Sequence, residues 1–141
     1  MKPPFQFILV DDDPTSNLIC KLTIEKTYGI SNTKAYEKPE AALNYLKTDF
    51  DADMATTTTL LLDINMPGMD GWEFMKAFSL LNENVKNNVK VYILSSSIDE
   101  ADISKAAAIP EVTGYLTKPF LQKNHMQTFT DRRPYFREIA C

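Results

Sequence analysis

The stretch from Leu60 to Gly71, Leu-Leu-Leu-Asp-Ile-Asn-Met-Pro-Gly-Met-Asp-Gly, contains the features that decide the fold. Its leucines predict a β-strand buried on both faces, because such a strand has no side to present to water. Asp63 follows at once. Pro67, Gly68 and Gly71 predict a tight turn, since proline fixes φ and glycine permits unusual backbone angles. A carboxylate therefore stands between a buried strand and a turn.

Short apolar runs of this kind recur along the chain and alternate with longer helical patterns. This alternation predicts an α/β protein of the doubly wound class, in which helices cover both faces of a parallel sheet. The expected strands are residues 5–10, 33–36, 60–64, 89–94 and 112–116. Residues 49–59, which include the run Thr56 to Thr59, are expected to form a loop before the third strand.

Capping residues and prolines mark the expected helices. Asp13 and Pro14 predict the N-cap and first residue of one helix, and Gly29 predicts its end. The others are expected from Pro39, over 72–81, over 99–110 and, with few apolar residues, over 120–129. The expected apolar faces are Leu18, Ile19 and Leu22; Ala42, Tyr45 and Leu46; Phe74 or Met75 with Phe78; Ile103, Ala106 and Ala107; and Leu121, Met126 and Phe129.

Length and composition favour one soluble domain. The chain has 141 residues, 44% hydrophobic and 24% charged, which predicts a single domain over 1–141 with its core at about 5–130 and a tail at 131–141. A net charge of −4 argues against direct nucleic-acid binding. Cys20 and Cys141 suggest no disulfide framework, and no apolar run is long enough for a leader or membrane span, so we expect a cytoplasmic protein.

Polar residues collect where the apolar runs stop. Asp11 to Asp13, Asp63, Ser95 to Ser97, and Lys118 each follow an expected strand. In open α/β sheets ligands bind beyond the carboxyl ends of the strands, so these separate segments are expected to meet in one crevice.

The residue types in this crevice indicate cation and phosphoryl chemistry. Several carboxylates held together repel one another unless a cation joins them, and a set of oxygen ligands without His or Cys favours Mg²⁺. A magnesium ion, a lysine and a hydroxyl around a carboxylate can neutralise the oxygens of a phosphoryl group during transfer. Asp63 is the best candidate for the nucleophile.

The same segments resemble the motifs of response-regulator receiver domains. The matching blocks are Val10-Asp11-Asp12, Asp63 to Gly71, Leu94-Ser95-Ser96 and Lys118-Pro119-Phe120, in the family's order and spacing. The resemblance covers about residues 5 to 130. It implies a flavodoxin-like (βα)5 fold with a five-stranded parallel sheet in the order 2-1-3-4-5.

The resemblance also implies a function and a set of roles. Asp63 would receive a phosphoryl group from a histidine kinase or histidine phosphotransfer protein, and the domain would catalyse its own phosphorylation and dephosphorylation. Mg²⁺, with Mn²⁺ as a possible substitute, would be bound by Asp63 together with the three other metal ligands named in the next sentence. The other implied roles are Asp11, Asp12 and the Asn65 backbone carbonyl as metal ligands, Lys118 as the phosphoryl contact, Ser95 as the switch hydroxyl, Tyr115 as the aromatic switch residue, and Ser97 and Asn65 as tuners of dephosphorylation.

Several interpretations stay open beside these roles. Asp13 is interpreted as a helix cap rather than a ligand, and Ser96 and Ser97 are expected either to line the site or to cap the fourth helix. With no output domain expected after the tail, the signal would pass to a downstream protein target or along a phosphorelay. The runner-up function is a receiver-like interaction module that is not phosphorylated.

Two other classes fit the residues less well. A dehalogenase-like phosphatase needs an acid two residues after its nucleophile, where this chain has Asn65. A nucleotide-binding module needs a glycine-rich phosphate loop, which the four glycines do not form.

Overall fold

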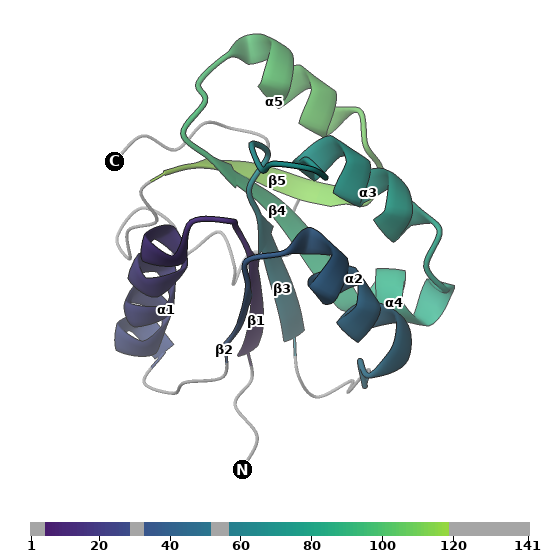
Figure 1. The fold of residues 1–141 in the computed structure, drawn as a ribbon. Helices are drawn as coiled ribbons and strands as arrows, with labels where there is room; N and C mark the ends of the chain where they lie inside the picture. Colours follow the sequence, from purple (N-terminus) through teal and green to yellow (C-terminus); the bar gives the residue numbers. More distant parts are fainter. Residues whose placement is uncertain (1–4, 29–32, 52–56, 119–141) are drawn as a thin grey trace.

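Five strands form one parallel sheet in the order β2-β1-β3-β4-β5, as predicted (Figure 1). The computed structural model of the protein describes residues 5–28, 33–51 and 57–118. The strands are β1 (Phe5–Val10), β2 (Thr33–Tyr36), β3 (Thr57–Leu62), β4 (Val89–Ser95) and β5 (Val112–Thr117). The helices are α1 (Pro14–Tyr28), α2 (Pro39–Thr48), α3 (Gly71–Ser79), α4 (Glu83–Asn88) and α5 (Glu100–Ala107).

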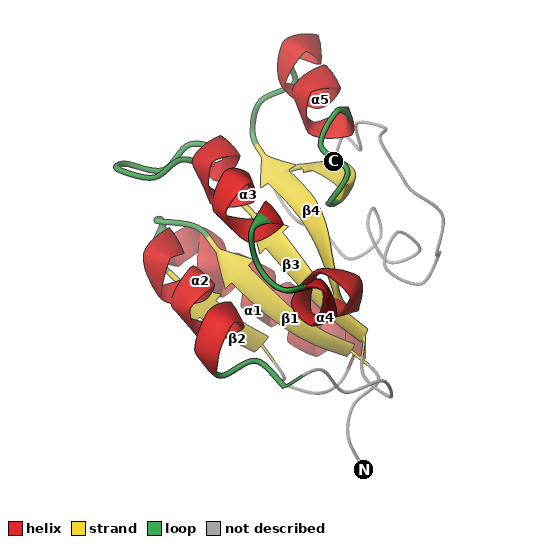
Figure 2. Cartoon of the chain, turned by 90° about the vertical axis from the view of Figure 1, so that its right-hand side faces the viewer, coloured by secondary structure: helices red, strands yellow, loops and turns green. Residues whose placement is uncertain are grey.

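Successive residues of each strand contribute to two hydrophobic clusters, one on each face of the sheet. Ile8 and Val10 of β1 pack with α2 and α3, whereas Phe7 and Leu9 pack with α1. Figure 2 shows the sheet between α1 and the helices of the other face. Burial on both sides explains why β1, β3 and β4 are almost continuously apolar.

The third strand begins earlier than predicted. β3 starts at Thr57, so the expected loop over 49–59 is wrong at its end, and Asp63 and Ile64 lie beyond the strand. Thr58 and Thr59 are buried and pair with Gln6 and Phe7 of β1. β-Branched threonines suit a strand, and this preference outweighs the polarity that suggested a loop.

The apolar face predicted for α1 is wrong. Leu18, Ile19 and Leu22 are 54%, 45% and 55% exposed, while Cys20 and Ile24 pack on the sheet. These two residues are four apart and form an alternative stripe at the helical period. Which stripe faces inward depends on how the helix is rotated when it docks, which the sequence pattern does not fix.

The remaining helices agree more closely with the predictions. Ala42 and Leu46 of α2 and all three candidates of α3 are buried, whereas Ala107 of α5 is exposed, contrary to prediction. The short α4 was not predicted, because Val85 is its one buried residue and a single apolar position sets no period. The expected helix over 120–129 and the tail lie outside the described residues.

Candidate functional site

Three aspartates meet at the carboxyl ends of the central strands. Asp11 follows β1, Asp63 follows β3, and each is buried. With Asp12 they offer carboxylate oxygens that all lie within 4.8 Å of one another. The register brings them together, because Val10 pairs with Leu62 and the Asp63 N–H donates to the Val10 carbonyl at 2.9 Å.

Lys118 supplies the positive charge of this cluster. Its Nζ lies 2.6 Å from Asp11 Oδ2 and 3.7 Å from Asp63 Oδ1. The backbone N–H of Lys118 donates to the Ser95 carbonyl at 2.8 Å, so the end of β4 holds the lysine beside the acids. One ammonium opposes three carboxylates, which leaves a site suited to a further cation.

Burial and the imbalance of charge shift the pKa values of Asp63 and Lys118. Burial raises the pKa of Asp63 from 3.8 to about 6; Lys118 opposes this rise, Asp11 adds to it, the Asn65 N–H opposes it and Asp12 adds to it. Burial lowers the pKa of Lys118, but its hydrogen bond to Asp11 and the charge of Asp63 outweigh this, so the net shift is upward. Lys118 is therefore held in its charged form by the two carboxylates. The positive charge of Lys118 alone does not offset the burial of the Asp63 carboxylate and the repulsion from Asp11 and Asp12.

The turn after Asp63 is closely packed against it. The Gly71 N–H donates to the Ile64 carbonyl at 2.8 Å, and a Cβ at Gly71 would lie 2.8 Å from the Asp63 carbonyl oxygen. Gly68 has a φ of +80°, a conformation that glycine adopts without strain. Asp70 caps α3 by accepting from the Glu73 N–H at 2.9 Å, so the loop that follows Asp63 ends on an ordered helix.

The fold agrees with comparisons to known proteins. Residues 7–130 match the family model described as the response regulator receiver domain. The chain belongs to the response-regulator receiver family. Its receiver fold is similar to that of a receiver protein from Dyadobacter fermentans, at 26% identity and a TM-score of 0.81 over 89% of this chain and 95% of that one.

Two further relatives match most of the chain. A two-component response regulator from Cytophaga hutchinsonii is 28% identical, with a TM-score of 0.76 over 92% of this receiver and 96% of that chain. A probable methanogenesis regulatory protein, FilR2, from Methanothrix harundinacea is 23% identical over 94% of this receiver and 84% of that protein. The receiver is thus a component of two-component signalling.

The hydroxyl and aromatic positions of the receiver lie at the next strands. Ser95 is fully buried at the end of β4, where its Oγ accepts from the Ser97 N–H at 3.1 Å. Tyr115 is also fully buried, and its hydroxyl donates to the Ser97 carbonyl at 2.9 Å. The structure therefore joins both predicted switch residues to Ser97. Their switch roles stay predictions.

The neighbouring polar residues divide between the site and the helices. Asp13 is exposed and accepts from the Thr15 N–H at 2.9 Å, which confirms it as the N-cap of α1. Ser97 accepts from the Asp99 N–H at 3.2 Å and donates to Asp102 of α5 at 2.7 Å, but the N-cap of α5 is Asp99, so neither serine caps this helix. Ser96 instead lines a cavity of about 360 Å³ together with Lys118.

One contributor was not predicted from the sequence. Asn17 of α1 is buried, and its Nδ2 donates to the Asp11 carbonyl at 2.9 Å. This bond ties the first helix to the segment that carries the acidic pair. In the sequence, Asn17 would stand out only as a polar residue on the buried side of the first helix. That side could not be identified before the inward face of α1 was known.

Asn65 is placed by the turn rather than by a strand. Its side chain is exposed, and its N–H points to Asp63 Oδ1 at 3.4 Å.

No helix in the described part of the chain combines the length and the hydropathy that crossing a bilayer requires.

Proposed function

We propose that this receiver accepts a phosphoryl group on the Asp63 carboxylate from a histidine kinase or histidine phosphotransfer protein. The observation that carries the proposal is the buried Asp63 carboxylate, gathered with Asp11, Asp12 and Lys118 at one edge of the sheet. An Asp63 oxygen attacks the phosphorus, the bond to the donor nitrogen breaks, and an acyl phosphate forms. Lys118 moves from the carboxylates toward the new phosphoryl oxygens.

The residues of the cluster fit a hard divalent cation. Asp11, Asp12 and Asp63 would hold Mg²⁺, or Mn²⁺ in its place, with the Asn65 carbonyl as a further ligand. Oxygen donors alone, in negative excess over Lys118, are the ligands these cations prefer. When bound, the cation supplies positive charge to the carboxylate and to the transferring phosphoryl oxygens.

The consequence of phosphorylation is a change in binding to a downstream protein, or transfer of the phosphoryl group along a relay. Ser95 and Tyr115 are the proposed switch residues, because both bond to Ser97 in the segment between β4 and α5. A hydroxyl drawn toward the phosphoryl group would alter that segment. We place these events in the cytoplasm, where two-component kinases present their phosphohistidines.

Incubation with acetyl phosphate and Mg²⁺ tests the proposal. Intact mass should rise by one phosphoryl group, borohydride trapping should locate it at Asp63, and EDTA should abolish it. Asp63→Asn should remove the modification. Asp13→Asn is the matched control, because it removes a neighbouring carboxylate outside the cluster while asparagine still caps a helix.

Modification that persists in Asp63→Asn would refute the assignment of the phosphoacceptor. A folded chain that binds Mg²⁺ but is modified neither by acetyl phosphate nor by phosphohistidine donors would favour the runner-up, a receiver that acts only by binding.

A further inference from the structure

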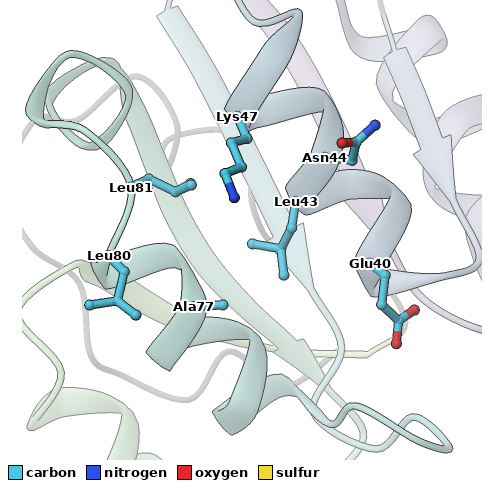
Figure 3. A pocket seen from close by; sticks show the side chains of 7 residues that line it. All are labelled: Glu40, Leu43, Asn44, Lys47, Ala77, Leu80 and Leu81. Atoms are coloured by element: carbon cyan, nitrogen blue, oxygen red, sulfur yellow. The ribbon is translucent and has the colours of Figure 1, made fainter.

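A groove of about 390 Å³ lies between α2 and α3 (Figure 3), and no residue of the acidic cluster lines it. Leu43 of α2 and Leu81, beyond α3, line it, and both are half-buried. Leu80 stands at its edge and is 86% exposed. Leu43 and Leu81 also pack against the core, whereas neither the core nor the proposed phosphoryl chemistry accounts for Leu80.

Leu80 is the most exposed large hydrophobic residue in the described part of the chain. It is the C-cap of α3, where its backbone N–H donates to the Ala77 carbonyl. Its side chain does not pack in the hydrophobic core. An apolar side chain presented beside an apolar groove is typical of a contact surface.

Two opposite charges flank the groove on α2. Glu40 and Lys47 are both exposed, both line the groove, and neither has an ion pair among the described residues. Residues seven apart lie on nearly the same side of a helix and about 10 Å apart along its axis. Leu43 lies between them, so α2 presents an acid, an apolar residue and a base in a line (Figure 3).

We propose that this surface is the interface of a homodimer, with a second copy of the chain as its occupant. A twofold axis that passes near Leu43 sets the two α2 helices antiparallel. Glu40 of each copy then faces Lys47 of the other, and Leu80 of each copy packs over the partner's apolar groove. The line of charges on α2 is complementary to its own reverse, which is the property that a twofold interface requires.

The dimer should be weak. The groove and its two charged ends offer less surface than the roughly 800 Å² per partner that stable complexes bury, so we expect a dimer that forms and dissociates reversibly. Sedimentation velocity of the full chain from low micromolar to millimolar concentration should show a reversible monomer–dimer equilibrium.

Charge variants test the twofold pairing directly. Glu40→Lys and Lys47→Glu each place like charges face to face in a homodimer, and each should weaken dimerisation about tenfold. An equimolar mixture of the two variants restores both opposite-charge pairs. The mixture should therefore dimerise within about threefold of the wild type, at a level neither variant reaches alone.

Leu80→Asp tests the apolar part of the interface and should abolish the dimer. Because Leu80 is exposed, the variant should keep the wild-type circular dichroism spectrum and melting temperature. Ile98→Asp is the matched control: Ile98 is 63% exposed and lies in the segment between β4 and α5, outside the groove. It should leave the dimer intact.

Three outcomes would overturn the proposal. The chain could stay monomeric at millimolar concentration, or dimerise equally well with Leu80→Asp. The mixed charge variants could also fail to recover what each loses. A monomeric chain that binds an amphipathic peptide in the groove would replace the second copy with a different partner. None of these outcomes bears on phosphorylation of Asp63.

Discussion

Asp63 differs from an ordinary surface aspartate in what surrounds it. Its carboxylate is buried, two further carboxylates lie within 4.8 Å, and one lysine lies 3.7 Å away. Burial, together with Asp11 and Asp12, raises its pKa to about 6 against the opposing effect of Lys118 and the Asn65 N–H. Asp63, the proposed phosphoacceptor, is thus a carboxylate whose ionised form costs the folded protein stability.

Asp63→Asn should therefore stabilise the metal-free protein at pH 7.5. A carboxyl whose pKa rises from 3.8 to about 6 on folding favours the folded state below pH 3.8, and this contribution is lost as the pH rises through 6. The asparagine amide does not ionise, so the variant does not lose this stability as the pH rises. Its free energy of unfolding at pH 7.5 should exceed that of the wild type by about 1–3 kcal/mol. Urea titrations in EDTA measure it. The difference should shrink to about 0.5 kcal/mol near pH 4 and vanish below pH 3.8, and a difference that keeps its full size at pH 4 would contradict this explanation.

Lys118→Ala should separate cation binding from the ion pair. The variant removes the 2.6 Å contact to Asp11, so the metal-free protein should lose stability. The three carboxylates remain, and no ammonium competes for them. Isothermal titration calorimetry should show Mg²⁺ binding at least as tight as that of the wild type. Binding more than tenfold weaker would mean that the lysine organises the acids rather than balancing their charge.

At the scale of elements, the loop between β3 and α3 depends on a glycine whose backbone lies in close contact with the end of β3. Gly71 begins α3 directly against the backbone of the strand end, where a Cβ would lie 2.8 Å from the Asp63 oxygen and 2.8 Å from Ile64 Cα. Both neighbours are backbone atoms and have no flexible side chain to move aside. The start of α3 and the position of Asp63 are therefore coupled.

Gly71→Ala should cost about 2 kcal/mol or more of unfolding free energy and should slow phosphorylation, because the strand end must shift to admit the methyl group. Gly68→Ala is the matched control in the same turn. Its added Cβ meets nothing within 4 Å, but φ is +80°, so a loss of about 1 kcal/mol is expected. Equal losses in the two variants, measured by urea unfolding, would show that contact is not the reason.

At the scale of the whole molecule, the acidic cluster joins segments that are far apart along the chain. Asp11, Asp63 and Lys118 come from the ends of β1, β3 and β5, and they are neighbours only in the folded sheet. An unfolded chain has no such site. Binding of a cation to the cluster is therefore linked to folding of the entire sheet.

Magnesium should accordingly raise the melting temperature. At a concentration one hundred times its dissociation constant it should add about 2.7 kcal/mol to the free energy of unfolding. Differential scanning calorimetry over a MgCl₂ series measures this increase. Asp12→Asn provides the comparison, since it removes one proposed ligand from the partly exposed edge of the cluster. A variant stabilised as strongly as the wild type would exclude Asp12 from the cation site.

The sequence by itself determined the class of fold and the composition of the candidate site. Buried parallel strands must be apolar throughout, and polar residues that follow them must meet at one edge, so local patterns were sufficient to predict β1, β4, the acidic cluster and Lys118. These predictions rest on chemistry that each segment carries alone.

Only the tertiary structure decided which side of α1 packs, where β3 begins and how the groove between α2 and α3 is formed. Leu18 and Cys20 belong to competing stripes of one helix, and docking against the sheet, with Asn17 bonded to Asp11, selects between them. Leu80 is a surface residue because α3 ends at it and its side chain does not reach the core. Such outcomes depend on contacts between distant segments, which no local period encodes.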